Sequence, residues 1–205
     1  MSTNRSKKYV SYGFMGDLRA TLSEFSRKTS TQHKIAVLLF LLLGVALRAV
    51  LLSRPIMLGE AELYMDFARL PVSELVVASA ASGNFVFHSL LTKVSTALFG
   101  VGVVQLRLPN FMAGILCMPL FYLFVRSMFN RYIALTTLAL VACSGPLIGM
   151  GAIAAGFGVC WFLFITSLVL GRHFIKSNDL TSGLLIALLS ALGLWTMPAY
   201  CYAAL

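Results

Sequence analysis

Long apolar stretches separated by short polar segments dominate the chain from residue 35 onward. The first runs from Ile35 to about Ser53 and carries a single charge, at Arg48. Residues 108–125 form an uncharged second stretch, and residues 132–171 hold no charge over forty positions. A helix needs about 20 apolar residues to cross the roughly 30 Å hydrocarbon core of a bilayer. These stretches therefore predict membrane-spanning helices, and the third is long enough for two.

Turn residues and the last apolar stretch complete a prediction of five spans. Ser144-Gly145-Pro146 lies near the middle of the long uncharged stretch, where glycine and proline predict the turn between two spans. The stretch from Thr181 to Leu205 is long enough to cross once more. We expect an all-α fold: a polytopic helical membrane protein with about five transmembrane helices and short interfacial helices in its first external loop.

The apolar stretch at residues 85–99 is too short for an ordinary span and is more typical of an interfacial or re-entrant helix. Its placement decides on which side two basic pairs fall, namely Arg126 with Arg131 and Arg172 with Lys176. If the stretch lies in the interface, both pairs share a side with the basic N-terminus, as the positive-inside rule requires. This favours a cytoplasmic N-terminus and an external loop over about residues 54–105.

Residues 1–34 are polar and basic, and they lack the cleavage site of a secretory signal. We expect a cytoplasmic N-terminal segment there, followed by one transmembrane module over residues 35–205. Residues 14–25 are compatible with a short amphipathic helix on the membrane surface or with a loosely ordered tail.

Composition agrees with a membrane protein, since 59% of residues are hydrophobic and only 11% are charged. Soluble domains are about a quarter charged, so a soluble enzyme is excluded. A net charge of +9 is also typical of nucleic-acid binding. Here the basic residues lie at the ends of apolar stretches, so we expect membrane lipids and no nucleic acid as partners. The four cysteines lie inside apolar stretches without metal-binding spacing, and they predict neither a zinc site nor disulfides.

The loop after the first span concentrates the scarce acids: it holds four of the seven, namely Glu60, Glu62, Asp66 and Glu74. We expect a short helix over residues 59–69 that Pro71 ends, with Glu62 and Asp66 on one face. Carboxylates at a membrane surface act as general bases or bind a divalent ion. The alternative is a solvated loop helix with an ion pair between Asp66 and Arg69.

A series of short motifs follows in order along the chain: Arg48, Gly59-Glu60-Ala61-Glu62-Leu63-Tyr64, Asn84, His88, Leu98-Phe99-Gly100 and Arg107-Leu108-Pro109-Asn110. This order resembles the N-terminal part of GT-C glycosyltransferases of the protein O-mannosyltransferase and aminoarabinose (lipid A) transferase group. Those proteins have an arginine late in the first span, an acidic motif at the start of a large external loop, and an Arg-Leu-Pro that opens the second span. The resemblance covers about residues 35–175.

The resemblance implies a membrane glycosyltransferase, or its N-terminal part, that moves a sugar from a polyprenyl-phosphate-linked donor to a lipid, protein or glycan acceptor. The reaction would take place on the external or periplasmic face, and the likeness to bacterial members implies the bacterial inner membrane. The catalytic candidates are Glu60, Glu62 and Asp66. The candidates for binding the donor phosphate are Arg54, Arg69, Arg107 and His88, whose alternative roles are loop pairing or an interfacial position. No cofactor is established by the sequence, and a divalent metal stays an open alternative.

The chain departs from this pattern in two places. The family's aspartate before the glutamate is Gly59 here, so Glu62 or Asp66 would have to replace it. Residues 144–158 lack a further acid that several members carry, and their small residues favour close helix packing. The family usually continues through more spans, so the resemblance implies a truncated chain or a reduced relative with a partner. The alternative function is a non-catalytic accessory or carrier protein of a glycan or lipid assembly system.

Overall fold

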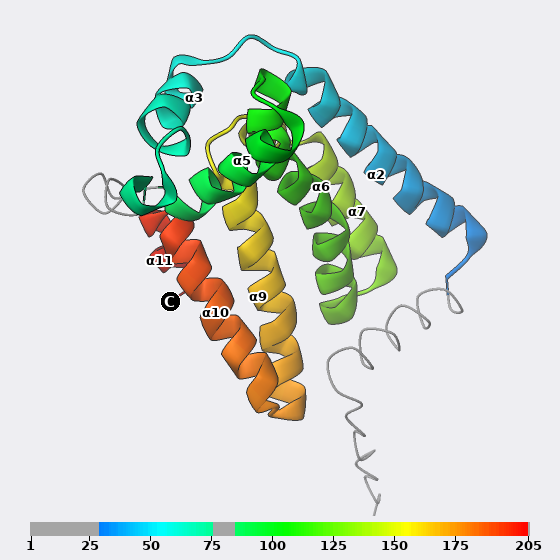
Figure 1. Ribbon diagram of the computed structural model, residues 1–205. Coiled ribbons are helices and arrows are strands. Elements are labelled where there is room, and N and C mark those ends of the chain that lie inside the picture. The colour runs from blue at the N-terminus through cyan, green and yellow to red at the C-terminus, as the bar shows by residue number, and fades with distance from the viewer. Residues whose placement is uncertain (1–28, 76–84, 205) are drawn as a thin grey trace, which may run out of the picture.

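A computed structural model describes residues 29–75 and 85–204, and within these ranges every regular element is a helix (Figure 1). Most of the predicted cytoplasmic segment, including residues 14–25, lies outside the described residues, as does the motif residue Asn84. The all-helical fold class is thus confirmed for the described part of the chain.

Three helices are long and apolar enough to cross a membrane: α2 (Thr31–Leu52), α6 (Val103–Met128) and α9 (Phe157–Ser177). A fourth candidate span consists of α7 (Arg131–Cys143) and α8 (Gly145–Ala152), which meet at a bend of 57°. Two apolar helices are shorter, α5 (Val86–Phe99) and α10 (Leu180–Thr196). The described residues therefore fit a multi-pass membrane protein with three or four spans, and the predicted count of five is not confirmed.

The remaining helical segments are short. In the loop after α2 they are α3 (Leu58–Leu63), a π-helical turn at Tyr64–Ala68 and a helical turn at residues 72–75. After α10 they are a 3-10 turn at Pro198–Tyr200 and α11 (Cys201–Ala204). The helical stretch from 58 to 68 agrees closely with the helix predicted over residues 59–69.

Within the long uncharged stretch, the connection between helices lies at other residues than predicted. We expected a turn between spans at residues 144–146, but the chain only bends at Ser144 and continues as α8. Proline is well tolerated in the first turn of a helix, so Pro146 starts α8 rather than reversing the chain. The connection to α9 comes later, at residues 153–156, where Gly156 takes a φ of +72° that favours glycine.

The last predicted span is also interrupted. The pattern suggested one passage from Thr181 to Leu205, but α10 ends at Thr196. Met197 is extended, because the residue before a proline disfavours the helical conformation, and Pro198 then opens the 3-10 turn.

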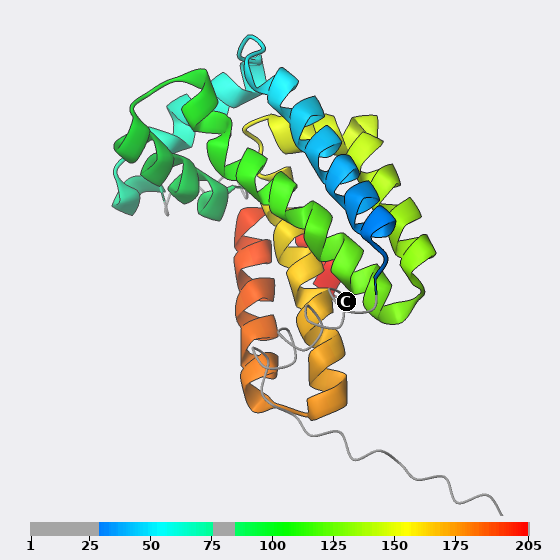
Figure 2. The same ribbon diagram turned by 90° about the vertical axis from the view of Figure 1, so that its right-hand side faces the viewer.

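Helix α6 is the centre of the bundle, packed against α2, α5, α7 and α9, while α10 pairs with α9. Figure 2 shows α2 and α7 on one side of α6 and the α9–α10 pair on the other. Between α2, α6 and α7 lies a core that includes Val37, Met118 and Leu138. Gly44 permits this close packing, since a Cβ added there would lie 2.5 Å from the Met118 sulfur.

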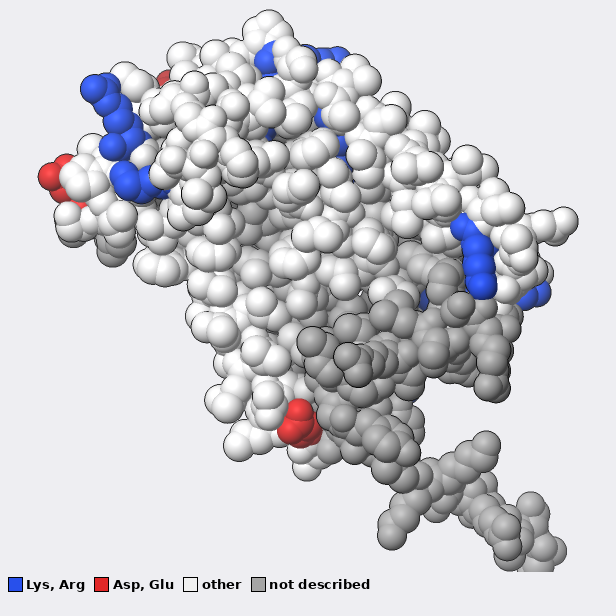
Figure 3. All heavy atoms as spheres, turned by 45° about the vertical axis from the view of Figure 1, so that its right-hand side comes forward, with Lys and Arg blue, Asp and Glu red and all other residues white. Residues whose placement is uncertain are grey.

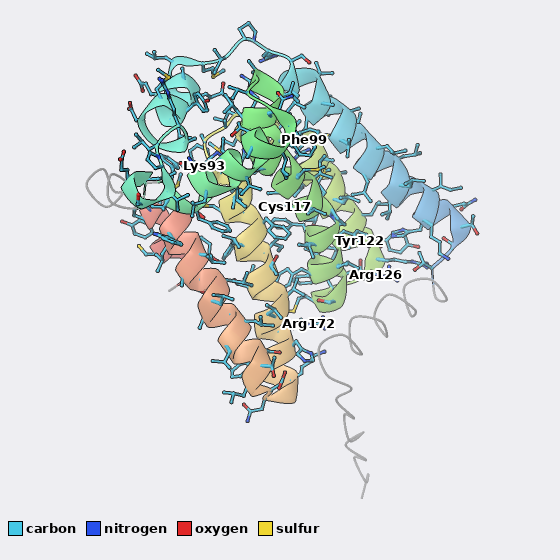
Figure 4. All side chains as sticks on the ribbon, viewed as in Figure 1. Lys93, Phe99, Cys117, Tyr122, Arg126 and Arg172 are labelled. Atoms are coloured by element: carbon cyan, nitrogen blue, oxygen red, sulfur yellow. The ribbon has the colours of Figure 1, made fainter. Side chains whose placement is uncertain are left out.

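Charged side chains gather toward the ends of the helices. The face in Figure 3 carries a broad uncharged surface between them, and helix α2 exposes large apolar side chains such as Leu39 and Leu42. Figure 4 places Arg126 and Arg172 toward one end of the bundle and Lys93 toward the other, where the loop after α2 lies. An apolar girdle between polar ends is the pattern of a protein surrounded by lipid.

Candidate functional site

A buried ion pair joins the acidic loop to the start of α6. The Arg107 Nε donates to Glu60 Oε1 at 2.8 Å, and its Nη2 donates to Oε2 at 2.6 Å. Both side chains are buried, and this two-bond geometry is the one that the planar guanidinium fork favours. Two residues predicted for separate roles, proton abstraction and phosphate binding, are thus partners of each other.

The other N–H groups of Arg107 bind the chain where α2 ends. The acceptors are backbone carbonyls, namely Leu51 at 3.3 Å, Leu52 at 2.9 Å, Arg54 at 2.8 Å and Pro55 at 3.0 Å. The last carbonyls of a helix lack partners within it, and a cation there is favourable. Every nitrogen of the Arg107 guanidinium is therefore engaged, so binding a donor phosphate would require breaking these contacts.

Both oxygens of Glu60 accept a second hydrogen bond. The backbone N–H of Met57 donates to Oε2 at 3.0 Å, which caps α3, and the N–H of Ala154 donates to Oε1 at 2.7 Å. Burial acts to raise the pKa of Glu60, but the hydrogen bonds and charge of Arg107 and the two backbone donors together hold that pKa below its ordinary value. Glu60 is thus held ionised, as an anchor between the loop, α6 and the α8–α9 connection.

Asn110 completes this anchor from α6. Its Nδ2 donates to the carbonyls of Met150 and Ile153, both at 2.7 Å. Its Oδ1 accepts from the N–H groups of Gly158 at 2.6 Å and Val159 at 3.2 Å. These are the backbone groups that the end of α8 and the start of α9 leave without helical partners. One buried amide thereby fixes the connection that Glu60 also binds.

His88 is fully buried on α5 against the same connection. Its Nε2 lies 3.4 Å from Thr92 Oγ1, and a Cβ added at Gly156 would lie 3.1 Å from the His88 Cβ. Burial lowers the pKa of His88 to about 4, while the backbone of Ala154 acts weakly in the opposite direction. The imidazole is neutral near neutral pH, so in this arrangement it packs α5 onto the bundle and offers no positive charge to a phosphate.

The other four candidates lie exposed on the loop itself. Glu62 belongs to α3 and Asp66 to the π-helical turn, with Arg54 before them and Arg69 after them. In the described part of the chain no ion pair joins Asp66 to Arg69, so that alternative is not observed. Within the same residues no group of three or more His, Cys, Asp or Glu side chains is placed to hold a metal ion. The loop thus exposes two carboxylates and two guanidinium groups.

Sequence reasoning gave Asn110 and Arg48 no structural role. The Nη1 of Arg48 donates to the carbonyls of Gly44 at 3.0 Å and Ala142 at 3.4 Å, and Nη2 donates to Val141 at 3.2 Å. Two of these carbonyls belong to the last turn of α7, beside the bend. The sequence held a signal for this role. A helix break within an apolar stretch needs polar partners, and few of the residues in the apolar stretches are polar.

Comparison with protein-family models, curated proteins and solved structures finds no match to this chain. The interpretation of its function therefore depends on the arrangement of these residues and on the order of the motifs.

Proposed function

We propose that this chain is a membrane glycosyltransferase, or the N-terminal part of one, that uses a polyprenyl-phosphate-linked sugar at its loop-bearing end. The observation that supports it is the convergence of motif residues that lie far apart in sequence. Glu60 and Arg107 bind each other across 47 positions, and His88 packs against the connection that Glu60 also binds. The motifs whose order resembles that of the transferase group thus meet where the loop after α2 is bound to the bundle.

In this proposal the buried and the exposed candidate residues have different roles. Glu60 and Arg107 position the loop, whereas Glu62 and Asp66 are the carboxylates free to accept the proton of an acceptor hydroxyl. A base must come within hydrogen-bond distance of that proton, and both of these carboxylates are exposed on the loop. Arg54 and Arg69 flank these acids and are free to bind the donor phosphate, for which guanidinium geometry is well suited.

The proposal includes an orientation in the bacterial inner membrane. Arg126 and Arg172 lie toward the end of the bundle opposite the loop (Figure 4). Basic residues concentrate on the cytoplasmic side, which supports placing the loop on the periplasmic side and the N-terminus in the cytoplasm. A lipid or glycan acceptor would meet the donor at the periplasmic surface.

Transfer from a labelled polyprenyl-phosphate sugar tests the proposal directly, with the full chain in membranes. We expect the double variant Glu62→Gln/Asp66→Asn to reduce the transfer rate at least roughly 100-fold, the scale of a lost general base. Glu74→Gln is the matched control, since Glu74 is another exposed acid of the same loop and its loss should leave the rate unchanged. Full transfer by the double variant would overturn the role of these acids.

A second candidate is a non-catalytic accessory protein that keeps the fold without the base, and Gly59 favours it. A Cβ added at Gly59 would meet nothing within 4 Å, so the position has room for the family's aspartate but lacks it. If the accessory role is correct, the wild-type chain transfers no sugar and Gly59→Asp creates activity without loss of folding. If the transferase role is correct, the wild type is already active.

A further inference from the structure

A narrow recess with a cavity volume of about 20 Å³ lies beside Arg48, between α2, α6, the bend of α7 and α8, and α9. Apart from the arginine its walls are mainly apolar, and they include Phe121, Leu147, Met150 and Trp161. Met150 and Trp161 are 40% and 37% exposed, so the recess opens toward the surroundings of the bundle. Cys117, labelled in Figure 4, lines it from α6.

Arg48 is a buried cation without a counter-charge. Its side chain is only 2% exposed, and its contacts are neutral: backbone carbonyls and the sulfur of Met118. Among the described residues no carboxylate pairs with it, since Glu60 is bound to Arg107. A charge inside an apolar bundle is costly unless a partner compensates it. Arg48 therefore points to a ligand that supplies negative charge.

The Nε of Arg48 is the free contact point, since it has no hydrogen-bond partner in the described part of the chain. It faces two glycines: a Cβ added at Gly114 would lie 3.8 Å from Nε, and one at Gly151 would lie 3.6 Å from it. Both glycines line the recess. Because neither position carries a side chain, the recess extends to the Nε–H, and its volume admits one atom the size of a water oxygen.

The depth of Arg48 suits a lipid headgroup. It stands four residues before the end of α2, which is about 6 Å along the helix axis at 1.5 Å per residue. We propose that one anionic phospholipid of the bilayer binds over the recess. One of its phosphate oxygens enters the recess and accepts the Arg48 Nε–H, and its acyl chain lies along Phe121, Leu147 and Trp161. The bound phosphate provides the missing counter-charge. This site is separate from the anchored loop, and it does not depend on sugar transfer.

Lipid binding to the purified full chain in detergent tests the site, measured by native mass spectrometry with phosphatidylglycerol and phosphatidylcholine. We expect phosphatidylglycerol to bind roughly tenfold more tightly, in line with one basic contact to an anionic headgroup. Gly151→Leu fills the recess and should abolish that preference. Gly149→Leu is the matched control, because it makes the same change on the same helix where a Cβ meets nothing within 4 Å. It should keep the preference.

Arg48→Gln should also abolish the preference for the anionic lipid. This variant also loses the contacts between Arg48 and the end of α7. If Arg48→Gln does not fold, Gly151→Leu and Gly149→Leu together test the lipid site. Equal binding of the two lipids by the wild type, or equal effects of Gly151→Leu and Gly149→Leu, would overturn the proposal. So would full competition by inorganic phosphate alone, which would show an anion site without a lipid.

Discussion

Single polar residues complete the hydrogen bonding of the broken helices in this bundle. Arg48 binds the carbonyls that end α7, Asn110 bridges α8 and α9, and Glu60 accepts the N–H of Ala154. An unpaired backbone group in hydrocarbon costs several kcal/mol, so each residue has a clear structural task. In many transporters such helix breaks hold the substrate or ions. Here the protein's own side chains occupy them, which argues against the carrier alternative.

His88 gives a prediction for how the stability of the protein depends on pH. An exposed histidine of the unfolded chain binds a proton below its ordinary pKa of 6.5, whereas folded His88 binds one only near pH 4. Its contribution to stability is therefore constant above pH 6.5 and falls as the pH drops from 6.5 to 4, by about 3 kcal/mol in total. Thermal unfolding of wild type and His88→Gln across this range measures the difference. Parallel pH profiles for the two proteins would contradict the buried neutral histidine.

The helices themselves show what the sequence pattern can and cannot predict. Runs of apolar residues and a helix-ending proline are local features, and they located the helices around residues 35–53, 59–69 and 85–99 closely. The turn predicted at residues 144–146 was wrong and the break before Pro198 was not predicted, because Pro146 and Pro198 are compatible with either the end or the start of a helix. The Glu60–Arg107 pair joins residues 47 positions apart, and no local pattern specifies which buried cation meets which acid.

Gly158 gives a prediction for the contact between α6 and α9. A Cβ added there would lie 2.6 Å from the backbone oxygen of Asn110, which cannot move without shifting α6. We expect Gly158→Ala to lower the free energy of unfolding by about 1–3 kcal/mol through overpacking. Gly149→Ala is the control, and with open space around it should be neutral or slightly stabilising. Equal midpoints of thermal unfolding for both variants would contradict this packing.

At the scale of the whole molecule, the bundle has two different ends. The loop with the anchored pair and the exposed acids lies at one end, and Arg126 and Arg172 lie toward the other (Figure 4). The anchor connects the loop to α2, α6 and the α8–α9 connection at once, so the loop is positioned by the bundle and not by its own short helices.

Single cysteines at the two ends test the proposed orientation in a cysteine-free background. Ser53, at the end of α2, and Met128, at the end of α6, are both exposed. We expect a membrane-impermeant maleimide to label Ser53→Cys in intact bacterial cells and Met128→Cys only after permeabilisation. The reverse pattern would invert the orientation, and labelling of both in intact cells would rule out opposite sides.

A double-mutant cycle between Glu60 and Arg107 decides whether the buried pair holds the loop on the bundle. The free energy of unfolding is measured for wild type, Glu60→Gln, Arg107→Gln and the double variant. Each single change leaves an uncompensated buried group and should cost about 3 kcal/mol. Exposed Glu62→Gln, the control, should change stability by less than about 0.5 kcal/mol.

Because the pKa of Glu60 is lowered by folding, the contribution of the pair is present above the ordinary carboxyl pKa of 4.5. It is lost as the pH falls through the lower pKa of the folded state. At neutral pH we predict a coupling energy between Glu60 and Arg107 of about 2 kcal/mol or more. Additive effects, with a coupling below about 0.5 kcal/mol, would contradict the anchor.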